Sequence, residues 1–253
     1  MAGNTPRKVN IDPFTLIPLH LELYFNATCL SDATGFIIKE NEKYYLITNW
    51  HVVTGRHPKD GMPLSKHGGV PNWLTVWFHE KGPIGTWIES KFNLYKNGEP
   101  VWIEHPLGKE VDVVAIPFEP DADCALHGID LIAAERDVLL VPSSPVSIVG
   151  FPKGLIVLGK FPIYKTGHIA SDIELDWQNK PVFLIDATTK GGMSGSPVVA
   201  KRVGFYLTSE GTTVGNTTKF LGVYSGREIA EDDIEVGRVW KPKVIKEILS
   251  QIK

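Results

Sequence analysis

Three residue types that together could form a nucleophilic triad stand far apart in this chain, each in a distinctive local sequence. Ser194 lies in the stretch 191–197, which reads GGMSGSP. Glycines on both sides allow a tight turn and bring backbone N–H groups close to whatever the serine attacks. His51 follows the strand-like run 46–50 (LITNW), and Asp112 lies in the apolar run 111–116 (VDVVAI). Histidine, aspartate and serine are the three parts of a nucleophilic triad.

Each of the three residues has an expected role and an alternative. A serine hydroxyl is a weak nucleophile, so it needs a base to take its proton, and the base needs a third group to fix its tautomer. We expect His51 to be the base and Asp112 the orienting group. A carboxylate between Val111 and Val113 is costly to bury unless it is hydrogen-bonded, and an imidazole N–H would satisfy it. The alternatives are a structural histidine, an edge-strand aspartate that faces water, and a β-turn with an exposed hydroxyl.

The local spacing and the chain order argue against other enzyme classes. An α/β-hydrolase nucleophile reads Gly-x-Ser-x-Gly, and its acid and histidine follow it along the chain. Here position 196 is serine, and both candidate partners precede the nucleophile. The sequence also holds neither the phosphate loop Gly-x-x-x-x-Gly-Lys-Ser/Thr nor the dinucleotide motif Gly-x-Gly-x-x-Gly.

Composition and charge limit the expected partners. Of the 253 residues, 43% are hydrophobic and 22% are charged, the balance of a globular chain with an ordinary core. The net charge of −3 gives no electrostatic footprint for nucleic acid or an anionic membrane, so we expect neither as a partner. Cys29 and Cys124 lack the spacing of a zinc site, so we expect no metal and no cofactor. Two free cysteines and the absence of an apolar signal segment favour a cytoplasmic protein.

Most of the chain alternates apolar and polar residues with the two-residue period of β-strands. The 24 glycines and 18 prolines supply turns between them, which favours a barrel or a sandwich. The strand candidates are 20–25, 34–39, 44–48, 74–79, 85–89, 111–117, 146–150, 157–165, 182–186, 197–200 and 219–224. One docked helix is predicted at 242–252, where apolar residues repeat at helical spacing after Pro242. The segment 56–72 is predicted to be a disordered surface loop, with a lid or a partner contact as alternatives.

With these residues described, the sequence resembles the chymotrypsin-like serine peptidases, and most of all their HtrA-type and trypsin-like bacterial members. Four blocks carry the resemblance and together cover most of residues 33–226. They are 35–38 with 46–53, 112–116, 149–155 with 166–171, and 186–197. They look like the family's histidine block, aspartate block, first strands of the second barrel and serine block, in that order. The resemblance implies an all-β fold of two six-stranded antiparallel β-barrels, with a C-terminal α-helix.

The resemblance also implies catalytic roles. His51 would be the general base and then the general acid, Asp112 its orienting partner, and Ser194 the nucleophile. The backbone N–H groups of Gly192 and Ser194 would form the oxyanion hole.

Substrate-binding residues follow from the same resemblance. Thr188 falls where the family places the floor of its primary specificity pocket, and it carries no charge to hold a basic side chain. Ser225 and Gly226 match the strand along which the substrate backbone pairs.

Two residues depart from the family pattern beside the nucleophile. Met193 stands where digestive members have the aspartate that pairs with a newly cut N-terminus, so activation by that route is not expected. Ser196 stands where many members have glycine, and it adds a side chain behind the nucleophile. This second change is either tolerated or narrows the site.

We therefore expect an N-terminal β-barrel at 1–125 that carries His51 and Asp112, and a C-terminal β-barrel at 126–253 that carries Ser194 and ends in a helix. The expected function is that of a serine endopeptidase, which hydrolyses polypeptide substrates through an acyl-enzyme. Narrow specificity, or a protein partner or activator that gates the site, is expected as well. The alternatives are a catalytically silent peptidase-like binding module and a hydrolase of esters or other acyl compounds.

Overall fold

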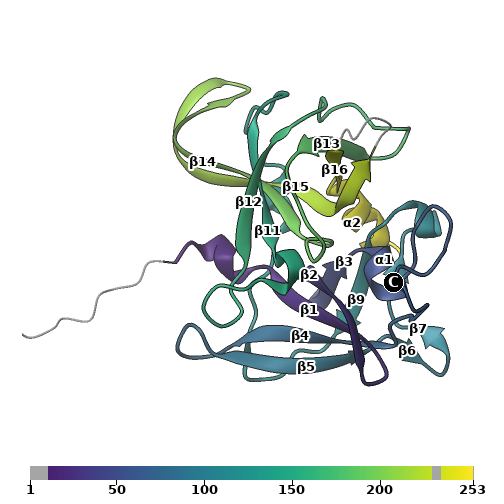
Figure 1. Cartoon of the computed structure of the whole chain (residues 1–253). Coiled ribbons are helices and arrows are strands. Elements are labelled where there is room, and N and C mark those ends of the chain that lie inside the picture. Colours follow the sequence, from purple (N-terminus) through teal and green to yellow (C-terminus); the bar gives the residue numbers. More distant parts are fainter. Residues whose placement is uncertain (1–10, 230–234, 253) are drawn as a thin grey trace, which may run out of the picture.

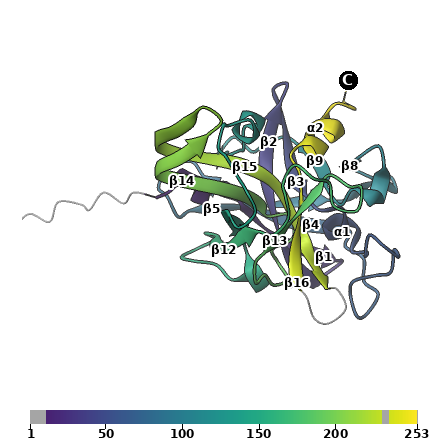
Figure 2. The ribbon, with the colours of Figure 1, turned by 90° about the horizontal axis from the view of Figure 1, so that it is seen from above.

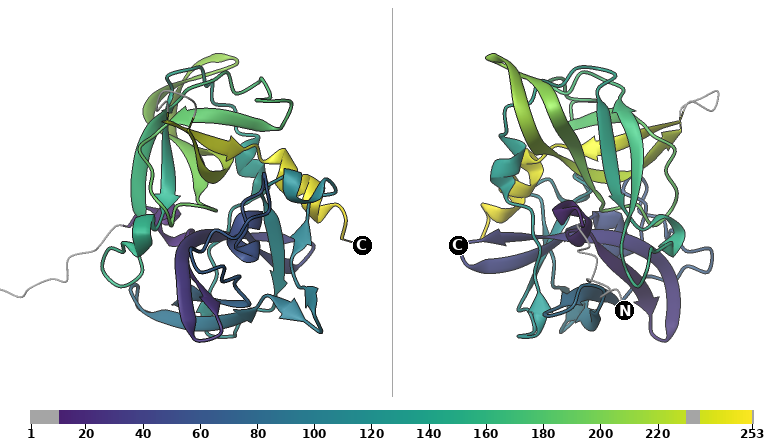
Figure 3. Two further views of the ribbon diagram at one scale, coloured as in Figure 1. Left: turned by 45° about the vertical axis from the view of Figure 1, so that its right-hand side comes forward. Right: turned by 90° about the vertical axis from the view of Figure 1, so that its left-hand side faces the viewer.

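Two β-rich lobes are stacked on each other, as Figures 1 and 3 show. The computed structural model describes residues 11–229 and 235–252. The first lobe holds strands β1 to β10, and the second holds β11 to β16. The fold is therefore mostly β with a short C-terminal helix, as predicted.

The first lobe is built on an antiparallel sheet of eight strands. Its order is β10-β4-β1-β2-β3-β9-β8, and β5 pairs with β4. The strands are β1 (Leu19–Phe25), β2 (Thr28–Glu40), β3 (Lys43–Thr48), β4 (Trp73–Glu80), β5 (Trp87–Asn93), β8 (Ile103–Glu104), β9 (Val114–Phe118) and β10 (Cys124–Ala125). The short strands β6 (Tyr95–Lys96) and β7 (Glu99–Pro100) form a separate pair.

The second lobe is a closed barrel of six strands in the order β11-β12-β13-β16-β15-β14. Its strands are β11 (Pro145–Gly150), β12 (Ile163–Ile169), β13 (Val182–Asp186), β14 (Pro197–Thr208), β15 (Gly211–Ile229) and β16 (Glu235–Trp240). The expected six-stranded barrel is thus present in this lobe. In the first lobe eight strands take part in the main sheet, and a six-stranded barrel there stays a prediction.

The C-terminal helix α2 (Lys243–Leu249) joins the two lobes. Its apolar stripe, Val244, Ile245, Ile248 and Leu249, is buried in one core cluster together with β3 and β9 of the first lobe and β14 and β15 of the second. The helix therefore buries the face that the sequence pattern predicted, and it does so across the lobe interface. The other helical segments are α1 (Trp50–Thr54), η1 (Pro13–Leu16), η2 (Gly108–Glu110), η3 (Leu131–Ala134) and η4 (Pro152–Gly154).

Strands β14 and β15 continue beyond the barrel as a long hairpin that projects from the molecule (Figures 1 and 2). The sequence pattern predicted only the segments at the barrel, 197–200 and 219–224. The extension keeps the two-residue alternation but exposes its apolar side chains, Val203, Phe205, Leu207 and Val214. The apolar side chains of this extension are therefore not part of the buried core.

The segment between the lobes keeps contact with the first lobe beyond residue 125. Gly128 forms a β-bridge with Ile37 of β2, and the Ile129 N–H donates to the Ile37 carbonyl over 2.9 Å. A division at 125/126 stays a prediction.

Cys29 is exposed and Cys124 is buried, and both are free thiols as predicted. None of the helices in the described ranges has the length and apolar character needed to cross a membrane.

Candidate active site

The structure brings His51, Asp112 and Ser194 into one hydrogen-bonded row. His51 lies on α1, directly after β3; Asp112 lies between η2 and β9; Ser194 lies in the turn before β14. The His51 Nδ1 and Asp112 Oδ2 atoms are 2.7 Å apart, and the His51 Nε2 and Ser194 Oγ atoms are 2.8 Å apart. A base within hydrogen-bond reach of the nucleophile, and an acid within reach of the base, is the geometry that proton abstraction from serine requires.

Asp112 is fixed by more than the imidazole. Its side chain is 3% exposed, and its Oδ1 atom accepts a hydrogen bond of 2.9 Å from the His51 backbone N–H. The buried side-chain amide of Asn49 donates to the Asp112 carbonyl over 2.6 Å. An edge-strand aspartate that faces water is therefore excluded. Asn49 was missed in the sequence, although it stands two residues before His51.

The nucleophile turn requires glycine at two positions. Gly192 has φ +91° and Gly195 has φ +84°, both in the left-handed region that favours glycine. A Cβ on Gly192 would lie 2.2 Å from the Phe151 carbonyl oxygen, and one on Gly195 would lie 2.0 Å from the Thr34 carbonyl oxygen. The glycines that the sequence analysis singled out therefore let this turn pack against both lobes.

Hydrogen bonds to two backbone carbonyls fix the direction of the two N–H groups predicted to form the oxyanion hole, those of Gly192 and Ser194. The Gly191 carbonyl accepts from the Lys153 N–H over 2.6 Å, and the Met193 carbonyl accepts from the Ser196 N–H over 3.0 Å. In a trans peptide the N–H points opposite to the carbonyl, so the next N–H in each plane, that of Gly192 or Ser194, points away from these partners. Within the described part of the chain, neither N–H donates a hydrogen bond. Both remain available to a substrate oxygen.

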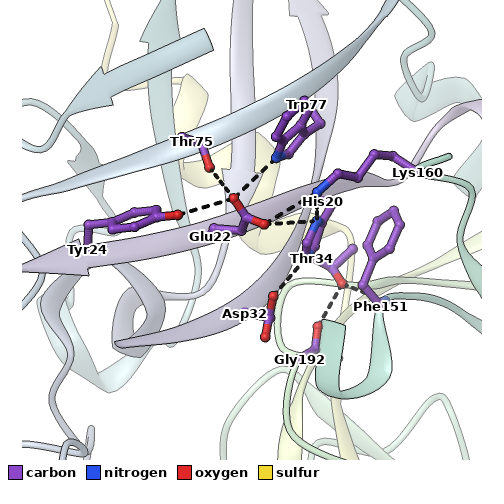
Figure 4. A network of polar contacts seen from close by, with 10 residues as sticks. All are labelled: His20, Glu22, Tyr24, Asp32, Thr34, Thr75, Trp77, Phe151, Lys160 and Gly192. Carbon is purple, nitrogen blue, oxygen red and sulfur yellow. Dashed lines mark hydrogen bonds and ion pairs between the residues drawn. The ribbon is translucent and has the colours of Figure 1, made fainter. Parts of the chain in front are cut away.

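Thr34 of β2 ties this turn to the first lobe, as Figure 4 shows in part. The fully buried Thr34 hydroxyl donates to the Gly192 carbonyl over 2.8 Å and accepts from the Phe151 N–H over 3.2 Å. The Thr34 N–H donates to the Ser194 carbonyl over 2.9 Å. Thr34, a residue of the first lobe, thus forms hydrogen bonds to both Gly192 and Ser194, the two residues predicted to form the oxyanion hole. Sequence reasoning missed it, since only the adjacent stretch 35–38 was assigned to the histidine block.

The two departures from the family pattern are accommodated by packing. Met193 is fully buried in the core of the second lobe, in one cluster with Val146 and Val198. The Ser196 side chain is also fully buried, and it faces Gly150, where an added Cβ would lie 2.1 Å from the Ser196 Oγ atom. The Ser196 side chain thus lies on the core side of the turn, and the two outcomes foreseen for it stay predictions.

The three predicted substrate-binding residues do not line the cavity that the structure shows beside the triad. Thr188 is exposed, whereas its neighbour Thr189 is buried and hydrogen-bonded to the Tyr224 hydroxyl. Ser225 is buried and Gly226 half-buried, at an irregularity in the pairing of β15 with β16. The Ser225 carbonyl already accepts from the Arg238 guanidinium over 3.3 Å. Substrate contacts at these positions stay predictions.

A cavity of about 220 Å³ opens beside His51 and Ser194 on the side of the first lobe. Its wall is mainly aliphatic, and the side chains that supply it come from β1, β2, α1 and the segment 56–72. That segment, predicted to be a disordered loop, has internal hydrogen bonds, including one of 2.8 Å from the Gly61 N–H to the His57 carbonyl. The prediction of disorder is wrong, because the segment packs against β2.

A charged network lies next to the cavity (Figure 4). His20, Glu22 and Asp32 have ligand atoms within 4.8 Å of one another, a grouping that could hold a metal ion. The Lys160 Nζ atom, however, lies 3.3 Å from both His20 Nδ1 and Glu22 Oε1, and His20 Nε2 lies 2.8 Å from Asp32 Oδ1. A lysine ammonium therefore stands where a cation would bind.

The pKa of Glu22 agrees with its pairing to the Lys160 ammonium. Burial alone would raise the pKa of Glu22, but Lys160 and the hydrogen bonds from Trp77 and Thr75 outweigh burial. They hold the pKa of Glu22 below its ordinary value. Glu22 is therefore ionised at neutral pH and paired with the lysine.

Comparisons with known proteins address the fold and the family of this chain. Among solved structures, the chain is similar to a serine endoprotease from Yersinia pestis, with a TM-score of 0.54 and 12% identity over 96% of this chain and 67% of that chain. At this identity the likeness shows the fold alone. A search of curated proteins finds no match. The model of the trypsin-like peptidase domain matches residues 33–204, well over half of the chain. The chain therefore belongs to the trypsin-like peptidase domain family.

Proposed function

We propose that this chain is a serine endopeptidase that works through an acyl-enzyme. One observation carries the proposal: an imidazole lies within hydrogen-bond distance of both a half-buried serine hydroxyl and a buried carboxylate. Membership of the trypsin-like peptidase family supports it, because the same three residue types fall in the matched range.

The chemistry begins at the Ser194 Oγ atom. His51 Nε2 takes the hydroxyl proton as Oγ attacks the scissile carbonyl carbon, and Asp112 stabilises the imidazolium that forms. The negative oxygen of the tetrahedral intermediate accepts from the Gly192 and Ser194 N–H groups. Removing one such donor typically costs about 10²- to 10³-fold in kcat.

His51 then gives its proton to the amine of the leaving group, the peptide C–N bond breaks, and the acyl group stays on Ser194. Water, deprotonated by His51, attacks the acyl carbon and restores the serine hydroxyl. The hydrogen-bond distances from His51 to Asp112 and to Ser194 support these steps.

Three features favour a silent binding module: Met193, Ser196 and the absence of a charge in the expected specificity pocket. The side chains of Met193 and Ser196 are buried in packing and leave the approach to Ser194 unaltered. This supports the active enzyme over the silent module. A cytoplasmic location and a gating partner stay predictions.

The test is covalent labelling by a fluorophosphonate probe, combined with a cleavage screen on peptides from a cell extract. We expect the wild-type chain to be labelled and to generate new peptide termini, and Ser194→Ala to do neither. Ser90→Ala, in β5 and away from the site, is the matched control and retains both activities. Equal labelling of wild type and Ser194→Ala would refute the proposal. Labelling without peptide cleavage would leave hydrolysis of other acyl compounds as the function.

A further inference from the structure

The cavity beside the triad lies on the side of the departing amine. In the proposed mechanism His51 gives its proton to that amine, so the leaving group must lie against His51. Most of the cavity lining comes from the first lobe, including His51 and Val52 of α1, and the second lobe adds only Gly192 and Ser194. By the family resemblance, the acyl part of the substrate pairs with the strand around Ser225. That strand, β15, belongs to the second lobe.

The wall of this cavity is suited to an aliphatic side chain. Its carbon surface comes from Leu23 of β1, Leu30 of β2, Val52 of α1, and Leu64 and Pro71 of the segment 56–72. Its volume of about 220 Å³ falls below the roughly 300–1,000 Å³ of complete small-molecule sites. The cavity therefore fits one or two side chains rather than an entire ligand.

The segment 56–72 is held against β2 by contacts that shape the cavity. The Leu64 N–H donates to the Gly55 carbonyl over 2.7 Å, which places Leu64 at the rim. Gly69 lies so close to Leu30 that a Cβ on Gly69 would be 3.0 Å from the Leu30 Cδ2 atom. The pocket is thus a built feature of two segments that pack on each other.

One charge faces this pocket. Asp32 lines it, and its side chain keeps about a third of its surface exposed. The Oδ1 atom of Asp32 is 2.8 Å from His20 Nε2, which fixes the carboxylate in place. The wall also holds the hydroxyl groups of Ser31 and Ser65 but is mainly aliphatic, and a fixed carboxylate in it opposes an acidic side chain.

We infer that this pocket selects substrates with an aliphatic, non-acidic residue directly after the scissile bond. The inference rests on the proposed function, since it assigns the pocket to the leaving group of that reaction. Burying a leucine-sized side chain in such a pocket, relative to glycine, supplies on the order of tenfold or more in selectivity.

Acyl transfer measures this selectivity without any knowledge of the natural cleavage site. p-Nitrophenyl acetate acetylates Ser194 and releases p-nitrophenol. An added amino-acid amide then occupies the leaving-group side, and its amine attacks the acetyl carbon. The ester bond to Ser194 Oγ breaks, and His51 passes the amine proton to Oγ. The products are the N-acetyl amino-acid amide and free enzyme, which chromatography quantifies against acetate.

We expect leucinamide to be acetylated about tenfold or more faster than glycinamide, and glycinamide faster than the α-amide of aspartic acid. Leu64→Glu, at the exposed rim, should abolish the preference for leucinamide, and Leu30→Glu should do the same deeper in the pocket. Leu175→Glu, an exposed leucine that does not line the cavity, is the matched control and keeps the wild-type order.

The outcomes separate the two proposals. Nitrophenol release that is equal in wild type and Ser194→Ala overturns the proposed function and this inference with it. Serine-dependent release with equal yields from leucinamide and glycinamide overturns the inference alone. An unchanged leucinamide preference in Leu64→Glu and Leu30→Glu also overturns it, because the selectivity would then arise elsewhere.

Discussion

Replacing Thr34 by valine removes one hydroxyl that serves two partners at the lobe interface. Valine keeps the shape of threonine, so the packing is retained while the Gly192 carbonyl loses its donor and the Phe151 N–H loses its acceptor. A buried polar group left without a partner costs roughly 1–3 kcal/mol. The Phe151 N–H is the buried one of the two, so we expect a loss of this size in the free energy of unfolding.

The larger effect is expected on catalysis. Without the Thr34 hydroxyl, the turn at Gly192 is no longer fixed to the first lobe. Two other hydrogen bonds still hold it: Lys153 N–H to the Gly191 carbonyl, and Thr34 N–H to the Ser194 carbonyl. We therefore expect kcat to fall about 10- to 100-fold, less than the roughly 10²- to 10³-fold for a missing oxyanion donor. KM should change little.

The assay is the rate of nitrophenyl ester hydrolysis and of fluorophosphonate labelling, with thermal unfolding as the folding check. Thr34→Ser keeps the hydroxyl and should retain near wild-type kcat. Thr75→Val removes a buried hydroxyl that donates to Glu22 over 3.1 Å, away from the nucleophile, so it should lose stability but not kcat. A folded Thr34→Val with kcat within about twofold of wild type would refute the reasoning.

Two further predictions concern buried ionisable groups. Asp112→Asn should lower kcat by about 10³- to 10⁴-fold at neutral pH, because the amide favours the His51 tautomer that cannot accept the serine proton; a folded variant with wild-type kcat would contradict this. Burial and the nearby His127 lower the pKa of His79 to about 4, so between pH 4 and about 6.5 the unfolded chain binds more protons and stability rises with pH. Chemical denaturation of His79→Leu should therefore show a loss of stability between pH 7 and pH 5 that is about 2 kcal/mol smaller than in wild type. A loss equal to that of wild type would contradict this.

Local sequence was sufficient to predict the chemistry. A serine between glycines, a histidine after a strand and an aspartate in an apolar run are recognisable because each sits in a short segment with a strong local preference. Glycine at positions 192 and 195 permits the left-handed backbone that this turn adopts. The C-terminal helix was predictable for the same reason, since its apolar stripe is set by helical periodicity alone.

Tertiary structure decided how that chemistry is held and what surrounds it. Thr34 and Gly192 are 158 residues apart, and nothing local in either segment indicates their hydrogen bond. The pocket exists only because the segment 56–72 packs on β2, and its aliphatic lining is spread over four segments of the chain. The β14–β15 hairpin extends beyond the predicted segments, and its alternating apolar residues stay exposed because this part of the strands lies outside the barrel. Short-range preferences fix turns and helices, whereas contacts between distant segments depend on how the completed lobes meet.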